Sequence, residues 1–532
     1  MQKWPFLVLT ISLIFSLANS SCHRKNDRNR KAPESLLHGA LNQKNNIPFD
    51  SNMVTTFYKS YPELNKYKED VMLVYREHRY HHIWFDDKGV VEFGQSLYNK
   101  EKEIKDEGVS CRFPYQEKID GVFDNDIENT LNNTETELMI TNLYLFYAQK
   151  VYKGIDEDTT VALGWLLPRK QFSYTGLLDS TFLDPKLLTR DDNALFSQYY
   201  KLRNVLQRYR EIEKNGGWNP IDLDPKLKAY KPGDTAKAIQ QIRERLFITG
   251  DIKQNSRSNE YDRALEEAVK RYQVRNGYNP DKSISPKLIK EMNVPIGERI
   301  KKIIVNMERC RWISPDFAKA KEYIVVNIPS FKLTYVRNGQ VALQSPVVVG
   351  KNVTKTVIFS GMLSYIVFSP YWNLPQSIIS KEVKPGMAKN KNYLESHNME
   401  WNNGQVRQKP GKNNSLGLVK FIFPNSNDIY MHDTPAKSLF AQERRAFSHG
   451  CIRVGKPRDL AIEILKDDPA WTPKRIDAAM NAGKESSCTL KTKIPVYIGY
   501  LTAWVNDQGV IYFYDDIYQM DGRLTQLLIA EK

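Results

Sequence analysis

The chain changes its hydrophobic periodicity near Tyr323, and this change constrains its fold more than any other feature of the sequence. Between about residues 51 and 292, apolar residues recur at helical spacing, as in the run ELMITNLYLFYAQKVYKG, where Gly154 is placed to end a helix. From Tyr323 onward, β-branched and polar residues alternate, and Asn338-Gly339 is typical of a hairpin turn. The sequence therefore predicts an α+β protein whose helical and strand-rich parts form separate domains.

The first 50 residues have the composition of a targeting segment followed by a tether. Residues 1–21 contain one lysine, an apolar run from Trp4 to Leu17 and then small residues, a run too short to span a bilayer comfortably. This pattern predicts a signal peptide and export to the cell envelope or periplasm. Ordinary cleavage after Ala18-Asn19-Ser20 and a lipoprotein signal that acylates Cys22 both remain open, and we favour the second.

Residues 22–50 are polar and charged, which predicts a flexible tether. No later apolar run is long enough for a membrane helix, so membrane contact is expected only through the N-terminal anchor. The chain of 532 residues is too long for a single core. We expect a helical scaffold at 51–230, two amphipathic helices and a short third at 231–300, and a mainly β domain at 320–525.

The net charge of +15 is spread along the chain rather than clustered, and no nucleic-acid motif accompanies it. A basic surface attracts anionic polymers over long range. For an exported protein, a carboxylate-rich cell-wall polymer is a more natural partner than nucleic acid, which we do not expect it to bind. The sequence does not indicate an oligomeric state.

Residues 374–416 interrupt the strand-rich domain with a segment rich in lysine, asparagine and glycine, of which 377–394 has a helical pattern. A segment of this length is too long for a plain loop in a compact sheet domain. We therefore interpret it as an inserted cap, or lid, beside the functional site.

Five cysteines in a chain of this size do not make a disulfide framework. If Cys22 is lipidated and Cys451 is free, then Cys111, Cys310 and Cys488 cannot all pair within one chain. We expect Cys111 and Cys310 to be small buried apolar residues. The three histidines of REHRYHHIW lack acidic or cysteine partners at ligand spacing, so we expect no metal.

Cys451 is the main catalytic candidate because of the residues that surround it in FSHGCIRV. A disulfide would need a partner cysteine, and a metal site would need more ligands than His432, the only other histidine nearby. A buried apolar cysteine would leave the Ser448-His449-Gly450 run unexplained. A nucleophile would use a base, backbone N–H donors for an oxyanion and a glycine that lets substrate approach. From the residues alone, we give the interpretation of Cys451 as a nucleophile about the same weight as the disulfide, metal and buried-residue interpretations together.

The motifs HDTP and SHGCIRV, in which 15 residues separate His432 from Ser448, resemble the signature of the L,D-transpeptidases, cysteine enzymes of peptidoglycan cross-linking. The stretches VNIPSFKLTYV, VVVGK and ERCRWI resemble the large branch of that family, which has a helical scaffold and a peptidoglycan-binding-like domain before the catalytic one. Three positions depart from the family pattern. Thr356-Val357 replaces a commoner Thr-Pro, Cys310 replaces an aromatic residue, and Arg453 stands where smaller members have asparagine.

The resemblance implies a role for each residue of the motifs. Cys451 would be the nucleophile and His432 the general base, with its ring oriented by the backbone carbonyl of Asp433. His449 and Ser448 would line the site, and the N–H groups of Gly450 and Cys451 would receive the oxyanion. No metal or organic cofactor is implied.

Three further residues have two interpretations each. Arg453 either holds a substrate carboxylate or pins the loop through a backbone carbonyl, and we favour the second. Tyr371 and Trp372 either wall the substrate groove or belong to the core.

The region 231–300 resembles a three-helix peptidoglycan-binding domain through AVKRYQVRNGY and ISPKLIKEMN, although Lys282 follows Asp281 where glycine is usual. Binding of glycan strands and a simple spacer role are therefore equal expectations.

The implied reaction is acyl transfer from a peptidoglycan tetrapeptide stem. Cys451 would form a thioester with the stem, release D-alanine, and pass the acyl group to an amine of a second stem to give a 3→3 cross-link. Water or a D-amino acid could serve as acceptor instead, because all three outcomes share one acyl-enzyme. Carbapenems are expected to acylate Cys451. The alternative from a different class is a non-catalytic lipoprotein that binds the wall.

Overall fold

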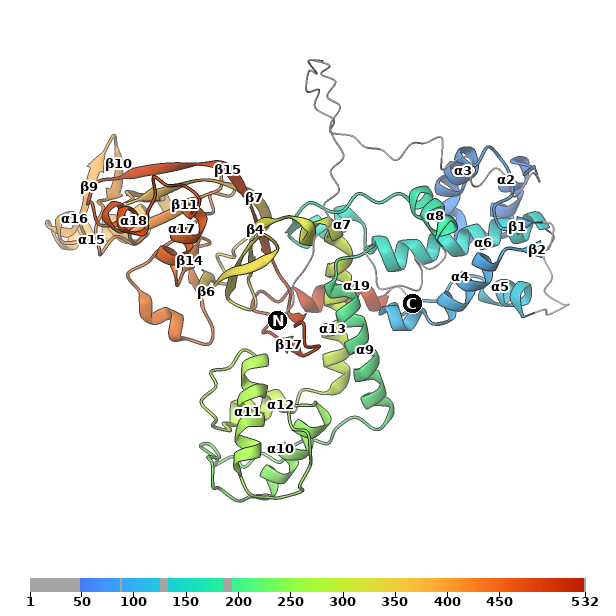
Figure 1. Ribbon diagram of the computed structural model, residues 1–532, viewed down its shortest axis with the longest axis horizontal. Coiled ribbons are helices and arrows are strands. Elements are labelled where there is room, and N and C mark those ends of the chain that lie inside the picture. The colour runs from blue at the N-terminus through green and yellow to red at the C-terminus, as the bar shows by residue number, and fades with distance from the viewer. Residues whose placement is uncertain (1–47, 87–88, 125–132, 185–193, 531–532) are drawn as a thin grey trace, which may run out of the picture.

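The computed structural model describes residues 48–86, 89–124, 133–184 and 194–530. The predicted signal peptide, Cys22 and nearly all of the tether therefore lie outside the described residues. The described residues form a helical region, a small three-helix region and a strand-rich region (Figure 1). Among the described helices, none is both long enough and apolar enough to cross a membrane.

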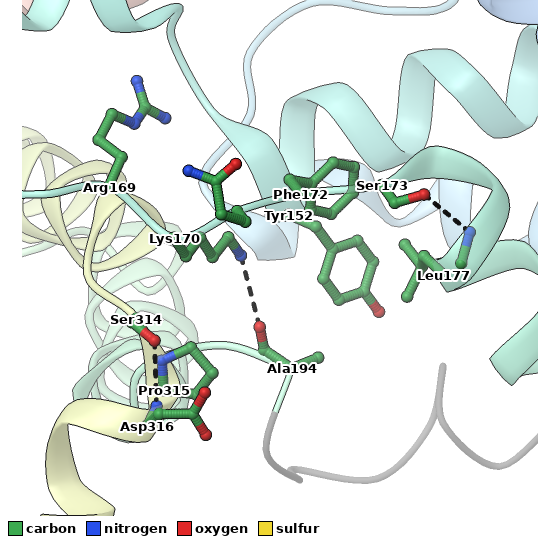
Figure 2. Close-up of a pocket in the computed structure, with 12 residues that line it drawn as sticks. Tyr152, Arg169, Lys170, Phe172, Ser173, Leu177, Ala194, Ser314, Pro315 and Asp316 are labelled. Atoms are coloured by element: carbon green, nitrogen blue, oxygen red, sulfur yellow. Dashed lines mark hydrogen bonds between the residues drawn. The ribbon is translucent and has the colours of Figure 1, made fainter. Parts of the chain in front are cut away.

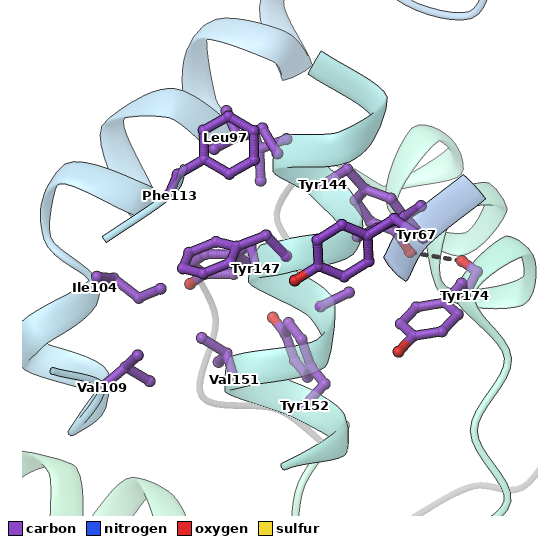
Figure 3. Close-up of a cluster of buried hydrophobic side chains, with 14 of the residues drawn as sticks. Tyr67, Leu97, Ile104, Val109, Phe113, Tyr144, Tyr147, Val151, Tyr152 and Tyr174 are labelled. Carbon is purple, nitrogen blue, oxygen red and sulfur yellow. Dashed lines mark hydrogen bonds between the residues drawn. The ribbon is translucent and has the colours of Figure 1, made fainter. Parts of the chain in front are cut away.

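The helical region is built around α6 (Asn133–Tyr147), which is buried from Thr136 to its end. The helix continues as a π-helical turn over Ala148–Lys153 and ends at Gly154 (φ 71°), as the sequence predicts. Figure 3 shows the aromatic side chains of this helix packed against residues of the neighbouring segments. The surrounding helices are α2 (Asn52–Ser60), α3 (Lys68–Glu77), α4 (Glu92–Lys102), α5 (Gln116–Phe123), α7 (Glu157–Ala162), α8 (Tyr174–Leu183) and α9 (Gln198–Lys214).

The core of the helical region also takes in segments from much later in the chain. Helix α13 (Ile296–Trp312) lies beside α9, and the hairpin of β16 (Ala503–Val505) and β17 (Ile511–Phe513) packs into the same core (Figure 1). The amide of Gln198 exchanges two hydrogen bonds with the backbone of Val505, at 2.8 and 2.9 Å. The helical core is thus assembled from three separate parts of the sequence, a feature that its local periodicity does not reveal.

The three-helix region has a hydrophobic core of its own, formed by residues between Ile221 and Met292. Asp262 and Ser285 cap two of its helices with their side chains. A buried ion pair joins Arg275 to Asp251, with N–O distances of 2.6 and 2.7 Å. The helices are α10 (Lys237–Ile248), α11 (Arg263–Arg275) and α12 (Pro286–Met292).

The strand-rich region contains a sheet that closes on itself. The hairpin expected from Asn338-Gly339 joins β5 to β6, and both turn residues have positive φ (52° and 74°). Strand β7 pairs with β15 on one side and with β11 on the other, so the order β11-β12-β14-β6-β5-β4-β15-β7 is a ring. These strands are β4 (Glu322–Asn327), β5 (Lys332–Arg337), β6 (Gln340–Gly350), β7 (Ile358–Phe368), β11 (Val419–Ile422), β12 (Met431–His432), β14 (Ile452–Val454) and β15 (Ser486–Gly499).

Short elements from other parts of the chain complete this region. Strand β3 (Trp165–Leu166) comes from the helical region and pairs in parallel with the start of β7. Strand β13 (Ala446–Ser448) pairs with the end of β6. Helices α17 (Pro457–Leu465) and α18 (Pro473–Met480) bury Leu460 and Ile476 against the sheet, and α19 (Asp521–Ala530) packs against α13.

The inserted segment is ordered and folds on itself. It has a three-stranded sheet in the order β8-β10-β9 and a small core of Leu374, Ile379, Val383 and Val406. The helical pattern predicted for 377–394 is present as short helical turns (Figure 1). Its elements are β8 (Trp372–Asn373), α14 (Gln376–Ile378), a π-helical turn (Ile379–Val383), α15 (Lys384–Lys389), α16 (Tyr393–Ser396), β9 (Met399–Asn402) and β10 (Gln405–Gln408).

Candidate active site

Two adjacent strands bring the predicted nucleophile and base to one face of the sheet. Strands β12 and β14 pair in parallel, with Met431 opposite Ile452 and His432 opposite Arg453. Met431 and Ile452 point into the core of the strand-rich region. Because side chains alternate between the two faces of a strand, His432 and Arg453 lie on the other face, with Tyr430 and Cys451 two residues before them.

The ring of His432 is buried and held by a backbone carbonyl. Its side chain is buried, and its Nδ1 lies 2.5 Å from the backbone oxygen of Asp433. Burial, together with the positive charge of Arg453, lowers the pKa of His432 to about 4, although hydrogen bonding to the backbone of Asp433 and Leu416 opposes this shift. With Nδ1–H donated to Asp433, Nε2 keeps its lone pair at neutral pH and can accept a proton.

The thiol of Cys451 lies against a backbone carbonyl. Its Sγ donates to the backbone oxygen of Asp428 at 3.7 Å. Burial raises the pKa of Cys451, although hydrogen bonding from Tyr430 and the charge of Arg453 partly oppose the shift. No hydrogen bond between Sγ and the His432 ring is recorded among the described residues. A raised pKa favours the neutral thiol over the thiolate at neutral pH.

Ser448 does not line the site, as the resemblance implied, but is buried beneath the loop. It is 2% exposed, and its hydroxyl donates to the backbone oxygen of Cys451 at 2.6 Å while accepting from the N–H of Gly450 at 3.2 Å. The hydroxyl therefore holds the loop and does not face substrate. The same contact engages the N–H of Gly450, so of the two expected oxyanion donors only that of Cys451 is left. His449 is exposed beside them.

The role favoured for Arg453, holding the loop through a backbone carbonyl, is not seen. Among the described residues, its guanidinium donates to no carbonyl. Its Nε is buried without a hydrogen-bond partner. Lys420 of β11 lies opposite His432 in the antiparallel pairing with β12, so its side chain shares the face of the site. Burial lowers the pKa of Lys420, which has no ion pair among the described residues. Lys420, on which the charge of Glu485 also acts, and Arg453 thus share the strand face of His432, and neither forms an ion pair among the described residues.

Lys420 was not found from the sequence, although the signal was present. It is a single charged residue in the apolar run LVKFIF, where a central strand would otherwise have none. Tyr430 was missed too. Its place two residues before His432, in YMH, puts it on the same strand face.

The two aromatic candidates have different surroundings. Burial raises the pKa of the Tyr430 phenol, and the nearby side chains of Cys451 and Trp372 also influence it, so Trp372 lies near this end of the site. Tyr371 is held differently. Its ring lies 3.9 Å from the guanidinium carbon of Arg407, and its N–H donates to Glu485 at 2.8 Å. Trp372, which comes just before residues 374–416, therefore lies near Tyr430.

A cavity of about 540 Å³ lies in the helical region and shares no residue with this site (Figure 2). It is lined by side chains that include Tyr152, Lys170 and Phe172, and by the loop that follows α13. Burial lowers the pKa of Lys170 to about 7. Among the described residues, no group of three or more His, Cys, Asp or Glu is arranged to hold a metal ion.

Cys451 and His432, from two adjacent strands, and the two cations on the same face form the candidate site. Residues 321–473 match the family model of the L,D-transpeptidase catalytic domain, YkuD, and residues 69–206 match a Scaffold domain. The chain therefore carries an L,D-transpeptidase catalytic domain behind a helical scaffold.

The chain is also similar to one curated protein and to several solved structures. A Haemophilus influenzae protein assigned to the L,D-transpeptidases is 36% identical over 244 residues, which is 42% of this chain and 48% of that protein. The chain thus spans about half the length of this curated relative. An L,D-transpeptidase of Mycobacterium smegmatis shares 14% identity, with a TM-score of 0.20, over 34% of this chain and 58% of its own. An L,D-transpeptidase of Stackebrandtia nassauensis shares 14% sequence identity, with a TM-score of 0.21. The match covers 53% of this chain and 96% of that chain.

Proposed function

We propose that this protein is a peptidoglycan L,D-transpeptidase. Cys451 attacks the carbonyl carbon between the third residue of a tetrapeptide stem, a diamino acid, and the terminal D-alanine. The C–N bond breaks, D-alanine leaves, and a thioester remains on Sγ. A side-chain amine of a second stem then displaces the thiol, which gives a 3→3 cross-link. No cofactor takes part in this scheme.

His432 moves the protons in both halves of this reaction. The neutral ring accepts the Cys451 proton as Sγ attacks, and it returns that proton to the amine of the departing D-alanine. In the second half it takes a proton from the incoming amine. Before the first step, the thiol must turn from the carbonyl of Asp428 toward Nε2 of His432.

The observation that carries the proposal is the register of β12 and β14, which sets His432 and Cys451 on one face of the sheet. The pKa of His432, about 4, supports the role of base because the ring stays unprotonated at neutral pH. The N–H of Cys451 is the proposed oxyanion donor. His449, exposed next to it, lines the mouth of the site.

Arg453 and Lys420 suit a donor that ends in a carboxylate. A buried guanidinium nitrogen without a partner costs free energy until a ligand satisfies it. The terminal D-alanine carboxylate is an acceptor of the right charge. We assign its binding to Arg453, with Lys420 adding positive charge beside the base.

The inserted segment and the three-helix region belong to substrate recognition in this proposal. Residues 374–416 form a lid, and Trp372 beside it walls the groove. The three-helix region is proposed to bind glycan strands. Its Lys287 pairs with Glu443 at 2.7 Å, which ties that region to the stretch leading into FSHGCIRV. Export through residues 1–21 and anchoring through an acylated Cys22 complete the proposal.

Mass spectrometry of disaccharide-tetrapeptides incubated with the protein tests the function, with Cys451→Ala as control. Cross-linked dimers that lack one D-alanine, formed only when Cys451 is present, are the expected result. Tripeptides alone would mean that water is the acceptor, and exchange of labelled D-alanine would identify a D-amino acid acceptor. No change in any substrate would contradict the enzyme and favour a protein that only binds the wall.

A further inference from the structure

Thr356 contacts the backbone of the catalytic loop from a neighbouring segment. Its side chain is 1% exposed. The hydroxyl donates to the backbone oxygen of Gly450 at 2.7 Å and accepts from the N–H of Gly350 at 2.9 Å. Both hydrogen-bonding roles of this hydroxyl are therefore used within the fold.

Tyr518 holds Thr356 in turn. The Tyr518 hydroxyl, in a side chain that is 2% exposed, donates to the backbone oxygen of Gly350 at 2.8 Å and accepts from the N–H of Thr356 at 3.1 Å. Burial raises the pKa of this phenol, so it stays protonated and remains a donor. Thr356 is thus fixed through its backbone as well as its side chain.

The two segments approach too closely for any residue but glycine at position 350. A Cβ there would lie 2.0 Å from the backbone oxygen of Thr354 and 2.8 Å from the nitrogen of Thr356. The hydroxyl of Thr354 also reaches the loop, but it donates to the oxygen of Ser448, at 3.1 Å. Thr354 and Thr356 therefore hold different peptide groups of the same loop.

The peptide group between Gly450 and Cys451 carries both the oxygen that Thr356 holds and the N–H proposed to receive the oxyanion. A trans peptide is planar, so its C=O and N–H point in opposite directions. Gly450 has φ 123°, in a region that glycine enters freely, so its own conformation restrains this plane weakly. A hydrogen bond that fixes the oxygen therefore fixes the direction of the Cys451 N–H.

We infer that Thr356 and Tyr518 are positioning residues that set the oxyanion donor of Cys451. The inference rests on the proposed acyl transfer and deepens it. It also extends the catalytic unit beyond residues 321–473, because Tyr518 lies in the C-terminal segment. The N–H of Tyr518 donates to the hydroxyl of Tyr500 at 2.9 Å, and three residues after Tyr518 the carboxylate of Asp521 pairs with Arg309 of α13 at 2.7 Å.

The test compares two reactions of the same thiol in the full chain. Imipenem acylates Cys451 through a tetrahedral oxyanion, whereas iodoacetamide alkylates it by displacing iodide and forms no oxyanion. Both rates are followed by intact mass. In Thr356→Val and Tyr518→Phe, we expect the acylation rate to fall by about tenfold or more. The fall should stay below about 100-fold, the effect of removing an oxyanion donor altogether. The alkylation rate should change by less than about twofold.

Two further variants separate positioning from a general loss of structure. Thr356→Ser keeps the hydroxyl and should restore most of the acylation rate. Thr354→Val removes a neighbouring hydroxyl but leaves the 450–451 peptide held, so the ratio of acylation to alkylation should stay near wild type. Melting temperatures of all variants, measured alongside, confirm that folded protein is compared.

Three results would overturn the inference. Equal slowing of both reactions would mean that Thr356 and Tyr518 only support the fold. Unchanged acylation in both Thr356→Val and Tyr518→Phe would mean that the oxyanion donor is set by other contacts. Wild-type protein that is alkylated but neither acylated by imipenem nor active on disaccharide-tetrapeptides would reject the proposed function, and the inference with it, so the two failures are distinguishable.

Discussion

Cys310 and Cys451 lie in similar sequences and in opposite environments. Each has an arginine nearby, in ERCRW and in HGCIRV. Cys310 is fully buried in α13, among apolar side chains of the helical core, and burial raises its pKa well beyond its usual range. Cys451 is partly exposed on a strand face beside a neutral histidine.

The arginines make the difference clearer than the cysteines do. Arg309 pairs with Asp521, and Arg311 pairs with Glu308 and donates to two backbone oxygens. Arg453 has a buried Nε without a partner. A buried charge that the protein itself satisfies is structural, whereas one left unsatisfied in a partly exposed site is available to a ligand. The comparison therefore depends on hydrogen-bond partners, not on residue type.

The largest expected effect is the loss of Cys451. In Cys451→Ala, cross-linking and D-alanine release should fall by about 1,000-fold or more, because no other group can form the thioester. Imipenem should add its mass to the wild type but not to this variant. Substantial activity in Cys451→Ala would remove the distinction between the two cysteines.

His432→Ala should lower the acylation rate by about 100-fold or more, because the thiol loses its general base. In the wild type, acylation should stay level at mildly acidic pH and fall only as the pH approaches 4, where His432 becomes protonated. The measurement is the pH profile of kcat/KM. A fall centred near pH 6.5 would contradict the buried, neutral ring.

The free energy of unfolding should also depend on pH through His432. The pKa of His432 is about 4 in the folded state against 6.5 in the unfolded state. Between these values the unfolded chain binds a proton that the folded chain does not, so the free energy of unfolding decreases as pH falls from 6.5 to 4. His432→Gln should weaken this dependence, as measured by urea unfolding at several pH values.

Arg453→Met should raise KM for the tetrapeptide by about tenfold, the loss of one charge-assisted hydrogen bond. A stem that ends in D-alanine amide should show little difference between wild type and variant. Arg309→Met is the matched comparison, since it should lower the melting temperature. Equal KM values for Arg453→Met and the wild type would restore the interpretation of Arg453 as structural.

The smallest effect should come from Cys310. Cys310→Ala should leave the activity of folded protein near that of the wild type and lower the free energy of unfolding by about 1 kcal/mol, because a small apolar contact in a packed core is lost. In native protein, iodoacetamide should label Cys451 and spare Cys310, which peptide mapping would reveal. Labelling of Cys310 without unfolding would contradict its burial.

Local patterns predicted much of the fold, and the motifs HDTP and SHGCIRV supplied the candidate residues of the site. The hairpin at Asn338-Gly339, the end of α6 at Gly154 and the helical turns of 377–394 follow from spacing and turn residues alone. The assembly of α13 and β16–β17 into the helical core does not, because contacts between distant segments leave no periodic signal. Ser448 was misjudged for a related reason, since its hydroxyl is satisfied by the fold of its own loop.

The closed sheet has a consequence for any shortened form of this protein. Residues 321–473 contain seven of the eight strands of the ring but not β15, which pairs with both β4 and β7. They also lack β3, which covers the free edge at the start of β7. A fragment with those boundaries would expose unpaired strand edges of the kind that recruit further chains. Such a fragment should aggregate, and expression should therefore retain the scaffold and the residues after 473.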